Sequence, residues 1–273
     1  MECELSQLKV GFVGAGNMAY AVAEGLLKSG DISADNVTVS APSDRNLPRF
    51  QALGARVSHS NTEVACASRL LFIAVKPHLV PTVLGQISPH VTRQHVVVSV
   101  AAGVTLATLE ELLPDGVGVV RLMPNLPCVL QEGALLLARG SGAGPGVESL
   151  LKRLLAPCGL VEAGPEGWID AHTGMSGSGV AFVYLFAEAL ADGGVKMGIP
   201  AALAQRIAAQ TLLGAGLMLR DCGKPASVLR AEVCTPGGTT IHGLHALEKG
   251  GVRAAVMSAV EAATERAREL GRK

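Results

Sequence analysis

A run of small residues after the first apolar stretch has the types and spacing that bind a dinucleotide. Gly14, Gly16 and Ala19 occur as Gly-x-Gly-x-x-Ala, directly after the apolar run at 9–13 and at the start of a helical pattern. Gly14 allows a tight turn, Gly16 lets the backbone approach a pyrophosphate, and Ala19 lets the helix pack closely on a sheet. The amides at the helix start would then face the phosphates. The pattern predicts NAD(P) binding, and the alternative is a tight strand–helix turn without a ligand.

Later apolar runs end in further candidate residues, because parallel sheets bind ligands at the carboxyl ends of their strands. The second run ends at Ser40, where a site that prefers NAD places an acid on the ribose hydroxyls. A hydroxyl there, followed by Arg45, would tolerate a 2′-phosphate, although Asp44 acts against it. We therefore expect NADPH to be used at least as well as NADH. Lys76 is the cation at the end of the run at 70–75, with a solvated loop lysine as the alternative. The predicted cofactor-binding residues are Val13, Gly14, Ala15, Gly16, Asn17, Met18, Ser40, Ser43, Asn61, Ala74, Val75, Lys76, Pro77, Ala101, Ala102 and Gly103.

Two glycine-rich segments in the second half could hold an anion. The segment TGMSGSG at 173–179 precedes a long apolar helix pattern, and TPGGTT at 235–240 precedes a second helix pattern at 241–247. Small residues at a helix start leave backbone N–H groups exposed, and such amides beside hydroxyls suit a carboxylate. The alternative for each segment is an ordinary capped helix start. We expect a carboxylate site because both segments occur in a chain with a dinucleotide motif.

The elements that would position these residues alternate between strand and helix in the first half. Buried parallel strands read as continuous β-branched runs, as in VVVSV at 96–100. The alternation predicts an α/β fold with a Rossmann-like doubly wound sheet. The expected strands are 9–13, 37–40, 56–58, 70–75, 96–100, 117–122 and 159–162, and the expected helices are 17–29, 47–53, 61–67, 79–87, 106–112 and 148–155, with a loop at 139–146.

The second half looks helical throughout and is poor in charge. Between residues 174 and 219 the charged residues are Glu188, Asp192, Lys196 and Arg206. Helices this apolar on every face must be buried, and a domain of ~100 residues cannot bury several of them alone. We therefore predict a dinucleotide-binding domain at 1–167 and an all-α dimerisation and substrate domain at 168–273. The alternative is a helical domain that packs only on its own first domain.

The composition argues against several classes of function. The 273 residues include 23 basic and 23 acidic side chains, so the chain lacks the basic excess of a nucleic-acid-binding protein. Six cysteines contain no CxxC pair, so we predict no metal site and no disulfide framework, but mostly buried thiols in a reducing compartment. No apolar run reaches ~20 residues without a glycine or a charge, and the N-terminus has no signal-peptide core. We expect a cytoplasmic protein with no membrane or nucleic-acid partner.

Seven segments together resemble the pyrroline-5-carboxylate reductase family over residues 10–270. They are GFVGAGNMA, FIAVKPH, VVVSVAAGVT, RLMPNLP, TGMSGSGVAF, ADGGVKMGIP and TPGGTTIHGLHALE. The resemblance implies reduction of 1-pyrroline-5-carboxylate to L-proline, the last step of proline biosynthesis, and a helical dimer whose dimers assemble into a decamer. Among animal members the chain resembles the short cytosolic form. Two positions depart from the family pattern: Val180 replaces a proline after SGSG, and Pro124 replaces a threonine.

The substrate that the resemblance implies carries a carboxylate and a C=N bond. Once protonated, the imine accepts hydride readily, so the protein mainly positions the reactants and excludes water. The predicted substrate-binding residues are Val233, Thr235, Thr239 and Thr240, and the predicted catalytic residues are Thr240 and Ser178. For His242 and His245, three apart on one helix pattern, packing and interface hydrogen bonds are favoured over catalysis. In a dimer, the nucleotide and the TPGGTT segment can belong to different chains.

Two other functions fit parts of the sequence. A β-hydroxyacid dehydrogenase shares the glycine-rich helix start that Gly174, Gly177 and Gly179 imitate. Its chemistry needs a lysine four residues after the last glycine, and that position is Val183. A non-enzymatic NADPH-binding module would bind the cofactor without turning over a cyclic imine.

Overall fold

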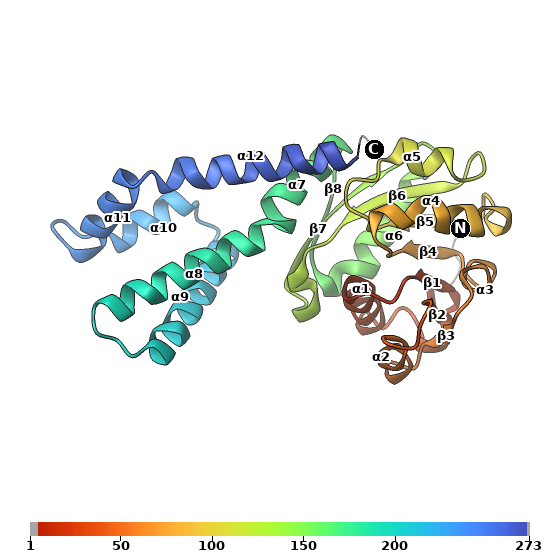
Figure 1. The fold of residues 1–273 in the computed structure, drawn as a ribbon, viewed down its shortest axis with the longest axis horizontal. Helices are drawn as coiled ribbons and strands as arrows, with labels where there is room; N and C mark the ends of the chain where they lie inside the picture. The colour runs from red at the N-terminus through yellow and green to blue at the C-terminus, as the bar shows by residue number, and fades with distance from the viewer. Residues whose placement is uncertain (1–4, 272–273) are drawn as a thin grey trace. The chain divides into compact units, whose positions relative to one another are not determined.

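The computed structural model describes residues 5–271, which form two compact units (Figure 1). Residues up to 177, together with those from 262 onward, form the sheet unit, and residues 178–261 form the helical unit. The predicted domain boundary at 167/168 stays a prediction, and the compact units divide later in the chain. Helix α7 (Gly167–His172) belongs to the sheet unit because Ile169 is buried in one of its core clusters.

Eight strands form a single sheet in the order β3-β2-β1-β4-β5-β6-β7-β8. Neighbouring strands are parallel, except that β7 runs antiparallel to β6. The predicted Rossmann-like fold is confirmed. The strands are β1 (Val10–Val13), β2 (Val37–Ser40), β3 (Arg56–Ser58), β4 (Leu70–Ile73), β5 (Val96–Ser99), β6 (Gly118–Met123), β7 (Gly133–Arg139) and β8 (Gly159–Ala163). The first six helices are α1 (Asn17–Lys28), α2 (Leu47–Ala52), α3 (Asn61–Ala67), α4 (Val80–Ile87), α5 (Leu106–Glu111) and α6 (Pro145–Leu155).

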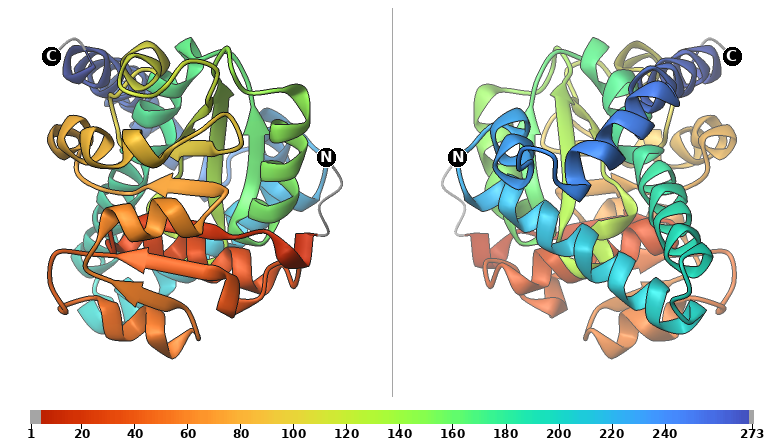
Figure 2. Two further views of the ribbon diagram at one scale, coloured as in Figure 1. Left: turned by 90° about the vertical axis from the view of Figure 1, so that its right-hand side faces the viewer. Right: turned by 90° about the vertical axis from the view of Figure 1, so that its left-hand side faces the viewer.

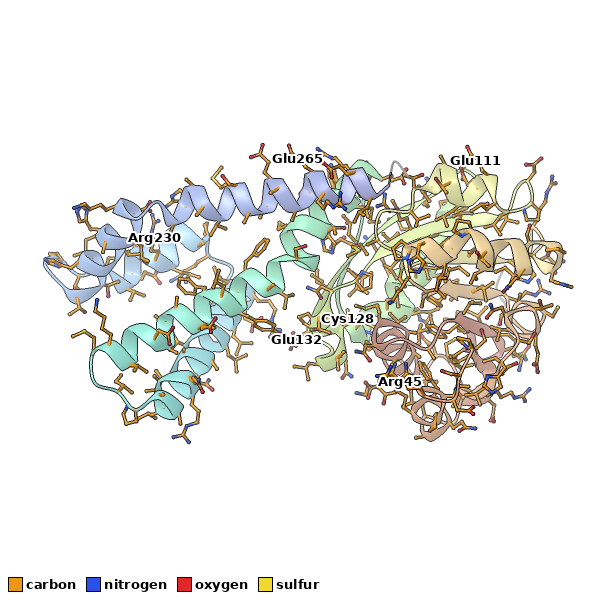
Figure 3. All side chains as sticks on the ribbon, in the orientation of Figure 1. Arg45, Glu111, Cys128, Glu132, Arg230 and Glu265 are labelled. Atoms are coloured by element: carbon orange, nitrogen blue, oxygen red, sulfur yellow. The ribbon has the colours of Figure 1, made fainter. Side chains whose placement is uncertain are left out.

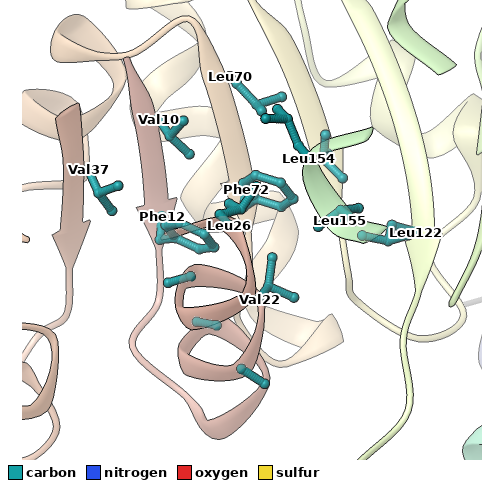
Figure 4. Close-up of a cluster of buried hydrophobic side chains, with 14 of the residues drawn as sticks. Val10, Phe12, Val22, Leu26, Val37, Leu70, Phe72, Leu122, Leu154 and Leu155 are labelled. Atoms are coloured by element: carbon teal, nitrogen blue, oxygen red, sulfur yellow. The ribbon is translucent and has the colours of Figure 1, made fainter. Parts of the chain in front are cut away.

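Helices cover both faces of this sheet, and each face has its own buried cluster (Figure 2). One cluster packs α1, α2 and α6 against the strands, and the other packs α3, α4, α5 and α7. In the first cluster the rings of Phe12 and Phe72 stack with centroids 4.8 Å apart, beside Val22 and Leu26 of α1 (Figure 4). Because both faces are buried, the central strands read as uninterrupted apolar runs. This self-contained core fixes the strand ends that carry the candidate site.

Strand β7 is the main element that the sequence pattern does not predict. Its sequence, GALLLAR, has no alternation that separates a strand from a buried helix. Its conformation depends on pairing with β6, in which Leu122 lies opposite Leu137, and with β8. The loop expected at 139–146 is correspondingly shorter, since α6 already begins at Pro145, a residue suited to the first helical position.

The helical unit consists of long helices with almost no core of its own. Its elements are α8 (Gly179–Lys196), α9 (Ala201–Asp221), α10 (Ala226–Val233), α11 (Thr239–Lys249) and the first part of α12 (Val252–Leu270). Its buried hydrophobic cluster contains three alanines, Ala191, Ala204 and Ala208. Many large apolar side chains stay exposed, among them Tyr184, Leu185 and Met197. The predicted helical character is confirmed. The apolar surface of these helices is not buried within a single chain.

One helical stretch among residues 5–271, at 167–196, is long and apolar enough to cross a membrane. Its mean hydropathy reaches 1.3, and 11% of the window is buried. The helix of a subunit interface meets the same criteria, because its apolar side chains are buried only in the assembly. Length and hydropathy therefore do not decide between lipid and protein here.

The cysteines described by the structure are all free thiols. Cys128 and Cys158 are buried in the sheet unit, and burial raises the pKa of the Cys158 thiol to about 12. Cys66 and Cys222 are exposed, so the expectation of mostly buried thiols is too broad. Cys3 lies outside the described residues. Position in the fold, rather than residue type, decides which thiols are protected.

Candidate active site

The turn between β1 and α1 has the geometry expected of a dinucleotide-binding loop. Gly14 has a φ of 105°, and its amide donates to the Ser40 carbonyl at 2.9 Å. A Cβ on Gly14 would lie 2.5 Å from the Ala74 carbonyl oxygen, so both the conformation and the space require glycine. A Cβ on Gly16 would meet nothing closer than 4.0 Å. Glycine at that position therefore leaves open space for a ligand.

The other predicted cofactor segments converge on this turn. In the sheet register Val13 pairs with Ile73, and Ile73 pairs with Ser99, so the segments after β1, β4 and β5 begin side by side. The Ala74 amide donates to the Val13 carbonyl at 2.8 Å. Lys76, in the middle of these segments, is exposed. The structure thus brings together the residues predicted at 13–18, 74–77 and 101–103.

Ser40 and Asn61 are arranged differently from the sequence expectation. Ser40 is fully buried, and its hydroxyl donates to Asn61 Oδ1 at 2.8 Å. Asn61 in turn donates to Gln86 Oε1 at 2.8 Å. The buried hydroxyl therefore orients the Asn61 amide, whereas we expected Ser40 itself to accommodate a 2′-phosphate.

The loop after β2 exposes the other residues expected near the ribose end. Ser43 and Arg45 are both exposed, and Figure 3 labels Arg45. Between them, Asp44 pairs with His59 Nε2 at 3.1 Å. The His59 Nδ1 atom also lies 2.9 Å from the Ala41 carbonyl oxygen. Asp44, the carboxylate that we expect to disfavour a 2′-phosphate, is thus paired with His59.

A buried ion-pair network lies between the cofactor segments and the TGMSGSG segment. The Arg121 guanidinium, on β6, is 3% exposed and contacts Asp170 Oδ1 at 2.6 Å and Glu166 Oε1 at 3.2 Å. The same Glu166 oxygen accepts the Leu106 amide at 2.7 Å. The network ties the sheet to α7 and to the start of α5, so it holds the chain that leads into residues 173–177.

The TGMSGSG segment begins with a wide turn at Thr173–Gly177, whose residues form a single π-helical turn. Asn125 donates to the Ser176 hydroxyl at 2.9 Å, and its own oxygen accepts the Ala134 amide at 3.0 Å. His172 Nε2 lies 3.2 Å from the Ala134 carbonyl, and burial lowers the pKa of its imidazole. A carbonyl oxygen can only accept, so this hydrogen bond requires a proton on Nε2. Local π-bulges of this kind often mark functional sites.

The TPGGTT segment forms a tight turn that opens helix α11. Gly237 has a φ of 67°, and the Gly238 amide donates to the Thr235 carbonyl at 3.0 Å. Gly238 is the N-cap and has no capping side chain, so the first amides of α11, at Thr239 and Thr240, have no cap. His242 Nδ1 lies 2.9 Å from the Gly238 carbonyl oxygen, a structural contact that agrees with the favoured reading of this histidine.

The predicted residues fall into two groups within the fold. Every predicted cofactor residue lies in the sheet unit. The predicted substrate-binding and catalytic residues all lie in the helical unit; they are Ser178, Val233, Thr235, Thr239 and Thr240. Val233 ends α10 with its side chain 62% exposed, and Ser178 is the N-cap of α8 without a capping hydrogen bond.

Comparison with known proteins decides the family. A model described as pyrroline-5-carboxylate reductase dimerisation matches residues 166–270, and one described as NADP oxidoreductase coenzyme F420-dependent matches residues 9–103. Pyrroline-5-carboxylate reductase 3 of Danio rerio is 67% identical over 270 residues, which cover 99% of this chain and 94% of the relative. The chain belongs to the pyrroline-5-carboxylate reductase family.

Solved structures of pyrroline-5-carboxylate reductases share the whole fold. The Plasmodium falciparum pyrroline carboxylate reductase with NADP bound matches with a TM-score of 0.87 at 32% identity, covering 97% of this chain and 99% of that one. The pyrroline-5-carboxylate reductase of Coxiella burnetii matches with a TM-score of 0.91 at 30% identity, covering 97% and 98%. The similarity therefore extends over both units of the pyrroline-5-carboxylate reductase fold.

Two features of this chain are not predicted by the sequence analysis. The Arg121 network was missed although an arginine inside the apolar strand VVRLM signals a buried cation that needs carboxylates. Arg49 was missed because nothing in its local sequence distinguishes it from a solvated helix residue. Its guanidinium reaches the dinucleotide turn, where it donates to the Ala15 carbonyl at 2.7 Å and to Asn17 Oδ1 at 2.9 Å.

Proposed function

We propose that this chain reduces 1-pyrroline-5-carboxylate to L-proline with hydride from NADPH or NADH, the last step of proline biosynthesis. The observation that carries the proposal is the 67% identity, over 99% of the chain, to a protein named pyrroline-5-carboxylate reductase 3. A dinucleotide turn with the required glycine conformation supports it independently. Fold alone would not, since related folds host other chemistries.

The turn at 13–18 fits the phosphates of a dinucleotide. Gly16 leaves space beside the backbone, and α1 begins without a capping side chain, so its first amides are available to an anion. When bound, the dinucleotide supplies the hydride. The residues at 74–77 and 101–103 would line the path of the cofactor, and Ser43 and Arg45 would hold its ribose end. Asn61, oriented by Ser40, would donate to the same end.

The substrate's carboxylate would be held at the start of α11. The uncapped amides of Thr239 and Thr240, together with their hydroxyls, provide donors and partial positive charge without a side-chain cation. Thr235 would complete this cradle, while Val233 would contact the ring and Ser178 would line the same pocket. Because the protonated imine already accepts hydride, these residues act by orienting the ring and excluding water. Thr240 is the catalytic residue proposed here, through its contact with the substrate.

An assay of NADPH oxidation tests this function directly. We expect turnover with 1-pyrroline-5-carboxylate and none when a 3-hydroxy acid is offered with the oxidised cofactor. Thr240→Val keeps the side-chain shape and removes one hydroxyl, so kcat/KM should fall roughly ten- to a hundredfold. Binding of NADPH should be unchanged, and inhibition by proline should weaken in parallel. Unaltered turnover in Thr240→Val would move the carboxylate site to residues 176–179.

The helical unit provides the basis for self-association. We propose a dimer formed through α8–α11, with dimers assembled into a decamer. The support is the exposed apolar surface of these helices and the dimerisation model matched at 166–270. A second copy would then cover the apolar stretch at 167–196, with no role for a membrane or a nucleic acid. Analytical ultracentrifugation in detergent-free buffer tests this, and an active monomer at micromolar concentration would contradict it.

We also propose a cytoplasmic location. Free thiols at every cysteine that the structure describes agree with a reducing compartment. Cell fractionation against a cytosolic and a mitochondrial marker tests this, with the protein expected beside the cytosolic marker.

A further inference from the structure

Arg49 contacts the dinucleotide turn, although nothing in the surrounding sequence predicts these contacts. It lies on α2, and its two terminal nitrogens reach the Ala15 carbonyl oxygen at 2.7 Å and Asn17 Oδ1 at 2.9 Å. Both acceptors belong to the Gly-x-Gly-x-x-Ala segment. One side chain thus links the start of α2 to the start of α1.

The guanidinium also lies over two aromatic rings. Its Cζ atom lies 4.9 Å from the centre of the Tyr20 ring and 5.4 Å from that of Phe50, and these rings meet edge to face with centroids 5.5 Å apart. The Nε atom of Arg49 is buried without a hydrogen-bond partner, and burial lowers the pKa of the group. Losing hydration and leaving one N–H donor unpaired both cost free energy of folding. The hydrogen bonds that Arg49 makes to Ala15 and Asn17 must offset that cost.

The contact with Ala15 has a direct consequence for the ligand side of the turn. In a trans peptide the C=O of one residue and the N–H of the next point in opposite directions. Because the Arg49 guanidinium donates to the Ala15 carbonyl, the Gly16 N–H must point away from α2. A Cβ on Gly16 would meet nothing closer than the Ala74 carbonyl oxygen at 4.0 Å, so a phosphate can approach the backbone there.

We propose that Arg49 is a positioning residue that holds the peptide between Ala15 and Gly16 in the orientation that presents the Gly16 amide to the pyrophosphate of NADPH or NADH. The inference rests on the proposed use of a dinucleotide. Because NADPH and NADH share the pyrophosphate, this role predicts equal effects on the two cofactors, which separates it from that of a ligand to the 2′-phosphate. Arg45, exposed on the loop after β2, is the candidate for that second role.

The difference between the two arginines gives a matched experiment. Arg49→Gln should weaken NADPH and NADH equally, by roughly tenfold in Kd, because both cofactors share the pyrophosphate. Arg45→Gln should weaken NADPH alone. Arg49→Lys keeps the charge but offers no planar fork, so it should restore part of the affinity. The KM for 1-pyrroline-5-carboxylate should not change in any of these variants.

A coupling measurement tests whether Arg49 acts through the turn. Asn17→Ala and Arg49→Gln should be non-additive in their effects on NADPH affinity, because the two side chains share one contact. Amide hydrogen exchange in the free protein provides a second test that requires no ligand. Exchange at the Gly14 and Tyr20 amides, which donate to the Ser40 and Gly16 carbonyls, should speed up in Arg49→Gln, while the amides of β4 and β5 keep their protection. If the glutamine variant unfolds, Arg49→Lys carries the same measurements.

Three results would overturn the inference: loss of NADPH affinity alone in Arg49→Gln, unchanged affinity for both cofactors, or unchanged exchange at the Gly14 and Tyr20 amides. A wild-type protein that binds NADPH but does not reduce the cyclic imine would instead contradict the proposed function. In that case the exchange and binding results still decide the role of Arg49.

Discussion

The two units bury their apolar residues in opposite ways. The sheet unit packs helices on both faces of its strands, and the clusters around Phe12 and Leu84 are closed to solvent within one chain. The helical unit has a buried cluster of only three alanines and leaves side chains such as Leu185, 67% exposed, in contact with water. Sheet layers allow one chain to cover both of its apolar faces, whereas a few helices cannot cover themselves. A self-sufficient cofactor unit is thus joined to a unit whose apolar surface stays exposed in a single chain.

A charge on the exposed apolar face should have the largest effect. Leu185→Glu would bury a carboxylate in the proposed dimer interface, where an unpaired charge is strongly unfavourable. We expect monomers and at least a hundredfold loss of turnover, with the sheet unit still folded. Leu130→Glu, at a leucine 78% exposed in the sheet unit, is the matched control and should leave the oligomer intact. Sedimentation measures the oligomeric state of both variants, and far-UV circular dichroism measures their folding. An intact Leu185→Glu dimer would contradict the view that the helical unit is buried by a second copy.

Within the sheet unit, the Arg121 network should matter more than any surface pair. Asp170→Asn removes one of two carboxylates from a buried guanidinium, so we expect unfolding to become easier by about 3 kcal/mol. Asp31→Asn removes the partner of Arg153, which also bonds through two nitrogens but on the surface. That change should cost far less, because water screens a pair of charges on the surface. Urea denaturation of both variants makes the comparison, and equal losses would argue against a special role for burial.

The buried imidazole of His172 should make the sheet unit sensitive to acid. Burial lowers its pKa in the folded protein below the ordinary value of 6.5. At higher pH both states are neutral, but below about pH 6.5 the unfolded chain binds the proton first, so stability falls as the pH falls through the folded pKa. His172→Gln should flatten the dependence of the melting temperature on pH in this range. The exposed His90→Gln should leave it unchanged, and an equal slope in His172→Gln would exclude this source.

The smallest effect is expected on the exposed loop after β2. Ser43→Asp places a carboxylate near the proposed 2′-phosphate site, where water and salt screen it, so NADPH preference over NADH should drop only about three- to tenfold. Ser40→Asp would instead bury a carboxylate beside Asn61 and should mainly destabilise the unit. Cofactor dissociation constants at low and high salt measure the first variant. A preference that stays the same at low salt would place the phosphate elsewhere.

The features that the sequence determined by itself depend on local spacing. Gly14 must be glycine because its φ is positive, and the glycine pattern around it therefore predicts the turn. Continuous apolar runs likewise predict most strands of the sheet, and uncharged helices predict a unit that needs a partner. In each case the cause lies within a few residues of its signal.

Other features were decided only when distant segments met. Strand β7 takes its conformation from pairing with β6, and the buried Ser40 hydroxyl donates to Asn61, 21 residues later in the chain. Arg49 reaches a turn 34 residues earlier, and Arg121 meets a carboxylate 49 residues later. A side chain's burial and partners are properties of the packed core rather than of its neighbours in the chain. Tertiary structure alone therefore separates Arg49 and Arg121 from the solvated arginines.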